Sequence, residues 1–189
     1  MRDWSYYAAA HRYDVHGSLD AERRCAALMR ELRSVRDESE LRRRADAGDR
    51  CAFIALLEIL VDADRLDELR AMQQAGDDRA GTTLMEALVE QGREDELREE
   101  VAAGHDVMWL VDYLSERGRL DDALVALQRW ARAYPDRDRL AHARRLDLLL
   151  NHGRVAEVRR AAASGDQAAV RRMRDVTGGQ PAEKPDSAG

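Results

Sequence analysis

Apolar residues along the chain recur with the spacing of a helix. Phe53, Leu56, Leu57 and Leu60 stand at positions i, i+3, i+4 and i+7, which places them on one face of a helix. The same spacing recurs in the pairs Leu84 and Leu88, Leu110 and Leu114, and Leu146 and Leu150. No stretch alternates with a period of two, and β-branched residues are scarce. The pattern therefore predicts an all-α chain without a sheet.

A second pattern repeats about every 28 residues and is built around the tripeptide Glu-Leu-Arg. The central residues of its copies are Leu41, Leu69, Leu97 and Val158, with Ala123 in a looser copy. Five residues before each of the first four stands a turn candidate, which is Arg36, Asp64, Gly92 or Gly153. Seven residues after each stands a glycine, which is Gly48, Gly76, Gly104 or Gly165. These shared offsets predict a repeat of two helices, a longer first helix and a shorter second helix such as 66–75 or 94–103.

The ends of the second helices carry a stop signal followed by a start signal. Ala47-Gly48-Asp49 and Ala75-Gly76-Asp77 each place a glycine where a helix ends and an aspartate where the next begins. Glycine adopts the left-handed conformation of a helix C-terminus at little cost, and aspartate accepts hydrogen bonds from the free amides of a helix N-terminus. Asp37-Glu38-Ser39-Glu40 resembles a capping box for the earliest second helix.

Hairpins of such short helices cannot bury their apolar faces alone, so neighbouring hairpins are expected to stack. We expect an α-solenoid of about eleven helices in about five stacked hairpins across residues 18–176. The segment 1–17 holds Trp4, Tyr6, Tyr7 and Tyr13 and is expected to cap the first repeat, or alternatively to form a dimerisation patch. Residues 177–189 have no apolar anchor and are expected to form a disordered tail.

One segment resembles a known repeat family. Gly118-Arg119-Leu120-Asp121-Asp122-Ala123-Leu124, continuing to Ala133-Tyr134-Pro135, is similar to the second helix of a tetratricopeptide repeat, which typically begins after Gly, carries Ala where helices cross and ends in Pro. The 28-residue units resemble the degenerate Leu-Arg and Ala-Gly-Asp helical repeats of uncharacterised actinobacterial proteins. The resemblance covers roughly Ala21 to Asp175. It implies a right-handed, tetratricopeptide-like α-solenoid that binds proteins or peptides, and it carries over no catalytic residue.

Charge is distributed unevenly along the 189 residues. The chain has 31 Lys+Arg against 37 Asp+Glu and a formal net charge of −6. Residues 51–107 hold 5 basic and 15 acidic side chains, whereas the region from Arg154 to Arg174 is rich in arginine. The acidic middle repels phosphate backbones, so nucleic acid is an unlikely partner and a basic protein segment is the expected one.

Part of this acidic charge is spaced regularly. Four first helices each carry an inner acidic residue six positions before the turn and an outer polar residue two positions before it, so each pair is i, i+4 on one face. These eight partner-binding candidates, here called the acidic ladder, are Glu58, Asp62, Glu86, Glu90, Asp112, Glu116, Asp147 and Asn151. One interpretation is an acidic groove for a partner. The alternative is a solvated face paired locally with arginines three residues further on, namely Arg65, Arg93, Arg119 and Arg154.

Motifs for catalysis or cofactor binding are absent from the sequence. There is no glycine-rich phosphate loop, no nucleophile elbow and no His-Glu-x-x-His zinc motif. His11 and His16 are five residues apart, which places them on different sides of a helix. Cys25 and Cys51 lie in successive first helices and could approach each other, but their apolar surroundings predict buried, reduced thiols. We therefore expect no enzyme activity, cofactor or metal.

The sequence thus predicts a non-enzymatic interaction scaffold or adaptor that binds a basic or helical partner segment. The alternative is a self-assembling homo-oligomer, in which the acidic middle of one copy meets the arginine-rich end of another. An enzyme with an irregular site is a third possibility. The protein is expected to be cytoplasmic, because no apolar run is long enough for a membrane helix and no secretory signal is visible.

Overall fold

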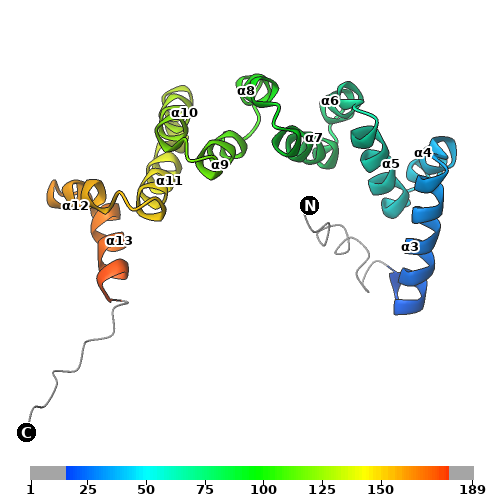
Figure 1. Ribbon diagram of the computed structural model, residues 1–189, viewed down its shortest axis with the longest axis horizontal. Coiled ribbons are helices and arrows are strands. Elements are labelled where there is room, and N and C mark those ends of the chain that lie inside the picture. Colours follow the sequence, from blue (N-terminus) through cyan, green and yellow to red (C-terminus); the bar gives the residue numbers. More distant parts are fainter. Residues whose placement is uncertain (1–15, 179–189) are drawn as a thin grey trace, which may run out of the picture. The chain divides into compact units, whose positions relative to one another are not determined.

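The computed structural model describes residues 16–178 of the chain, and these residues form eleven α-helices, one short 3₁₀-helix and no strand (Figure 1). The all-α prediction is therefore confirmed for this part of the chain. The predicted aromatic cap and the predicted disordered tail lie essentially outside the described residues. None of the helices between residues 16 and 178 has both the length and the apolar character needed to cross a membrane.

The chain divides into two compact units, with the boundary after Gly92. The helices of the first unit are α3 (Leu19–Ser34), α4 (Glu38–Asp46), α5 (Arg50–Asp62), α6 (Leu66–Gln74) and α7 (Asp78–Gln91). Those of the second are α8 (Glu94–Ala102), α9 (Met108–Glu116), α10 (Leu120–Ala133), the 3₁₀-helix η2 (Pro135–Arg137), α11 (Asp138–Asn151), α12 (Val155–Ala163) and α13 (Gln167–Gly178). The sequence predicts second helices at 66–75 and 94–103, and both end one residue earlier in the structure.

Every predicted turn is present. One of the two residues that follow each of five first helices has a positive φ, and the set comprises Arg36, Asp64, Gly92, Gly118 and Gly153. The glycines after four second helices also have positive φ, from 89° to 117°: Gly48, Gly76, Gly104 and Gly165. This left-handed conformation lets the amides that follow the helix donate hydrogen bonds to its last carbonyls, as the Asp49 amide does to the Arg44 carbonyl at 3.0 Å.

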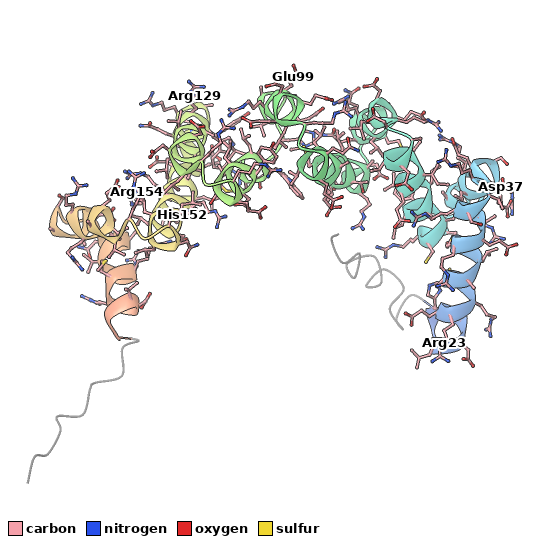
Figure 2. The ribbon with its side chains drawn as sticks, in the orientation of Figure 1. Arg23, Asp37, Glu99, Arg129, His152 and Arg154 are labelled. Carbon is pink, nitrogen blue, oxygen red and sulfur yellow. The ribbon has the colours of Figure 1, made fainter. Side chains whose placement is uncertain are left out.

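Aspartate caps start the following helices as the sequence predicts. The Asp49 carboxylate accepts hydrogen bonds from the amides of Cys51 and Ala52 at 3.0 and 3.1 Å. Asp37, at the start of α4 (Figure 2), accepts one from the Glu40 amide at 3.1 Å. The Glu40 side chain does not complete a capping box, because its carboxylate binds Arg43 and Arg44 instead.

The central residue of each repeat copy is the anchor of a second helix. Within each unit these side chains are completely buried, and they are Leu41, Leu69, Leu97, Ala123 and Val158. Second helices such as α4 and α12 bury only this one residue, because their other faces are charged. First helices bury more, and α5 buries eight residues because α3, α4, α6 and α7 all pack against it. The repeat seen in the sequence is therefore a repeat of core positions.

Candidate partner-binding face

The i, i+4 spacing places each acidic-ladder pair on one face of a first helix, but the two members differ in burial. In the first unit, Glu58 is buried on α5 and Glu86 is half-buried on α7, whereas Asp62 and Glu90 are exposed. In the second unit, Asp112 on α9 and Asp147 on α11 are half-buried, whereas Glu116 and Asn151 are exposed. The helices turn the inner member toward neighbouring helices and the outer member toward solvent.

Glu58 is the most deeply placed member, with 8% of the residue exposed. Its carboxylate forms an ion pair with Arg33 of α3, and Arg33 also reaches Asp62 at 3.4 Å. Burial raises the pKa of Glu58, since desolvation penalises its charged form more than Arg33 favours it. Arg33 therefore holds both ladder residues of α5 and ties α3 to α5.

The inner carboxylates of the second unit are also held by arginines from adjacent first helices. Arg144 of α11 pairs with Asp112 of α9. Arg172 of α13 pairs with Asp147 of α11, through its Nε at 2.5 Å and its Nη2 at 3.0 Å. The bond from Arg172 lowers the pKa of the Asp147 carboxyl. These pairs join one first helix to the next, so the inner half of the ladder has a structural role.

Sequence reasoning did not identify Arg33, Arg144 or Arg172 as the partners of the inner carboxylates. Arg33 precedes Glu58 by 25 residues and Arg172 follows Asp147 by 25, which is close to one repeat less one helical turn. That separation is the signal that would have found these two pairs. Spacings of three or four residues, by contrast, indicate only pairs within one hairpin.

The arginines expected to pair locally with the ladder have different partners. Arg65 is the N-cap residue of α6, and its guanidinium binds Glu68 on its own helix and Glu38 at the start of α4, each at 2.5 Å. Arg119 repeats this in the second unit with Asp122 and Glu94, both at 2.6 Å. Arg154, at the start of α12 (Figure 2), binds Glu157 and Asp121. These three arginines therefore bind carboxylates of second helices.

The second unit also contains a groove that the sequence did not predict. It has a volume of about 450 Å³ and lies among α10, α11 and α12. Leu124, Leu127 and Ala141 contribute apolar lining, and Arg145 and Glu157 contribute charge. The groove occurs where the repeat is longest, since the spacing from Ala123 to Val158 is 35 residues. The extra length lies in α10, which has 14 residues against the 9 of α4, and in η2, which has 3.

Three outer ladder residues, Asp62, Glu90 and Glu116, offer exposed negative charge, whereas Asn151 is neutral. Next to Glu116 in the chain, the Ser115 hydroxyl and the Nε2 atom of His152 are hydrogen-bonded at 2.7 Å. Exposed carboxylates of this kind suit electrostatic recognition of a cation. No protein-family model matches the chain, and neither a curated protein sequence nor a solved structure shows significant similarity to it.

Proposed function

We propose that the protein is a non-enzymatic interaction scaffold, or adaptor, that binds a basic segment of another protein against the first-helix face of α5 and α7. The observation that carries the proposal is the exposure of Asp62 and Glu90 on two helices that pack against each other. Charge supports it, since residues 51–92 hold nine acidic and three basic side chains. The corresponding outer positions of the second unit are Glu116 and Asn151.

The inner carboxylates act as supports in this proposal. Arg33 keeps Glu58 in place and orients α5, so the outer carboxylate stands at a fixed position on a rigid helix. Exposed charges of this kind set the encounter rate and the choice of partner more than the affinity. A basic helical segment with arginine or lysine on one face is the partner that this arrangement favours.

The finer architecture belongs to the same proposal. We infer from the repeat a right-handed, tetratricopeptide-like solenoid of about five hairpins, related to the degenerate actinobacterial repeats. We place the protein in the cytoplasm, where its two free cysteines would stay reduced.

The test reverses charge at the outer positions without disturbing the core. Tagged full-length protein with Asp62→Arg and Glu90→Arg is compared with wild type for partner recovery from lysate of the native cells, using quantitative mass spectrometry. The matched control reverses two exposed carboxylates on second helices of the same unit, Asp46→Arg and Asp67→Arg.

The proposal expects a partner with a basic segment that is recovered by wild type and by the control but not by the double variant. Its recovery should also fall as salt is raised, because exposed charges are screened. Equal recovery by wild type and the double variant, with circular dichroism showing both folded, contradicts the acidic face as the binding site.

Self-association is the second candidate function. It is favoured by exposed arginines at the end of the second unit, which are Arg159, Arg160 and Arg171. A basic end of this kind complements the acidic residues 51–92 of another copy. Sedimentation velocity at low and high salt distinguishes the two functions, since a monomer insensitive to salt excludes self-association.

A further inference from the structure

Three side chains with metal-binding atoms meet at the beginning of the first unit. His16 lies just before α3, Cys25 lies within α3, and Cys51 is the second residue of α5. The ligand atoms of the three residues all lie within 4.8 Å of one another. No metal motif is visible in the sequence, because Cys25 and Cys51 are brought together only by the packing of α3 on α5.

The side chains of this cluster contact one another through the atoms that could bind a metal. The Nε2 atom of His16 lies 3.3 Å from the Sγ atom of Cys51, and the thiols of Cys25 and Cys51 are hydrogen-bonded to each other. In a tetrahedral zinc site with Zn–S near 2.3 Å and Zn–N near 2.1 Å, neighbouring sulfur and nitrogen atoms are about 3.6 Å apart. The observed separation is thus close to the edge of a zinc tetrahedron.

The surroundings suit a bound cation with two thiolate ligands. Cys51 is 2% exposed, and Cys25 and His16 are half-buried. Asp49 fixes the first turn of α5 by accepting a hydrogen bond from the amide of Cys51. Two thiolates, a neutral imidazole and one divalent ion sum to zero charge, so the occupied site places no net charge in the partly buried space.

We propose that His16, Cys25 and Cys51 form a zinc site that fastens α3 to α5. Two sulfurs and one imidazole are the soft and borderline ligands that zinc prefers over magnesium or calcium. Three protein ligands leave one position for water. The site is independent of the proposed acidic face, which lies on other residues.

The position of the cluster indicates what the zinc does for the fold. The buried residues of α3 are Met29 and Leu32, both in its C-terminal half, whereas Leu19 near its start is 60% exposed. The N-terminal half of α3 therefore has little apolar packing of its own. A metal that binds both Cys25 and Cys51 would hold this half of α3 against α5.

The test uses the full chain, purified with reducing agent, stripped by a chelator and titrated with Zn²⁺ or Co²⁺. One metal per chain is expected, with the visible bands of tetrahedral Co²⁺ and thiolate-to-metal charge transfer in the near ultraviolet. Zinc should raise the melting temperature and slow deuterium exchange in residues 19–28.

Variants identify the ligands. Cys25→Ser and His16→Ala should each weaken zinc binding more than about 100-fold, beyond the ~10–100-fold typical of outer-shell changes. His152→Ala, in the second unit, is the matched control and should bind like wild type. His16 lies outside both α3 and α5, so its replacement tests the site even where Cys25→Ser fails to fold.

Four results would overturn the zinc site. The first is a stripped chain that takes up no stoichiometric metal. The second is Co²⁺ binding without a charge-transfer band. The third is zinc affinity in His16→Ala and Cys25→Ser equal to that of wild type. The fourth is a cysteine pair that oxidises to a disulfide while added zinc leaves the melting temperature unchanged.

Discussion

Arg65 donates hydrogen bonds to both carboxylate oxygens of Glu38, at 2.5 and 3.1 Å, and so links the start of α6 to the start of α4. The carboxylate of Glu38 also lies in the first turn of α4, where the helix dipole favours negative charge. Arg119 forms the equivalent link to Glu94 in the second unit. Arg65 and Arg119 therefore each hold two successive second helices of one unit together.

The Glu38 link makes stability depend on pH. Hydrogen bonds from Arg65 and then Arg42 lower the pKa of Glu38 from 4.5 to about 2. Because the folded pKa is the lower one, this stabilisation is complete above pH 4.5 and is lost as the pH falls toward 2. Glu38→Gln should melt a few degrees below wild type at pH 7, and the difference should vanish near pH 2.

Thermal melts of wild type and Glu38→Gln between pH 7 and pH 2 check this. Asp46→Asn, an exposed carboxylate at the end of the same helix, is the control. If the melting temperatures of wild type and Glu38→Gln differ by the same amount at every pH from 7 to 2, the assignment is contradicted.

Arg36 occupies a turn position that is glycine in three of the other four repeats, and its φ is +52°. A non-glycine residue in this left-handed conformation costs about 1–2 kcal/mol of stability. Glycine avoids that cost, but its greater conformational entropy in the unfolded chain offsets part of the gain. Arg36→Gly should therefore raise the free energy of unfolding by about 0.5–1 kcal/mol, measured by urea denaturation.

The reverse change at an equivalent turn provides the comparison. Gly118 has a φ of +72°, and a methyl group added there would meet no atom within 4 Å. Gly118→Ala should destabilise by about 1 kcal/mol through backbone conformation alone. A stabilising Gly118→Ala would show that the turns tolerate side chains without strain.

Replacement of Leu69 tests whether the repeat marks residues of the hydrophobic core. It is completely buried on α6, so Leu69→Ala should lower the free energy of unfolding by about 2–5 kcal/mol, as large-to-small core changes do. Leu19→Ala, at a 60% exposed position of the same unit, should change it by less than about 0.5 kcal/mol. Equal effects in urea denaturation would refute the assignment of Leu69 to the core.

Replacement of Arg172 tests the hydrogen bonds that link one first helix to the next. Besides its two hydrogen bonds to Asp147, Arg172 donates one through its Nη2 to the carbonyl oxygen of Ala143 at 3.1 Å, so three hydrogen bonds link α13 to α11. Arg172→Ala should lower the local opening free energy of α13 by about 1 kcal/mol, which corresponds to roughly five-fold faster amide exchange.

Deuterium exchange followed by mass spectrometry measures this locally. The adjacent Arg171 is exposed, and Arg171→Ala should leave exchange in α13 unchanged. A similar increase in both variants would assign the effect to lost helix propensity or net charge.

Much of the fold was predictable because it is encoded by short-range signals. The glycine and aspartate of Ala47-Gly48-Asp49 act on the chain within a few residues of themselves, and so the turn and cap follow from the sequence. The site was less predictable. The ladder positions were found from i, i+4 spacing, but their burial and their partners, such as Arg33 for Glu58, depend on how helices stack.

The sequence by itself determined an all-α chain, the places where its helices start and stop, and the core residue of each second helix, because these depend on local conformational energies and on a period visible along the chain. The tertiary structure alone decided which arginine binds which carboxylate, and which three residues bring sulfur and nitrogen together at Cys51. Those contacts join residues about one repeat apart, and the distance between such residues is fixed only when the helices pack.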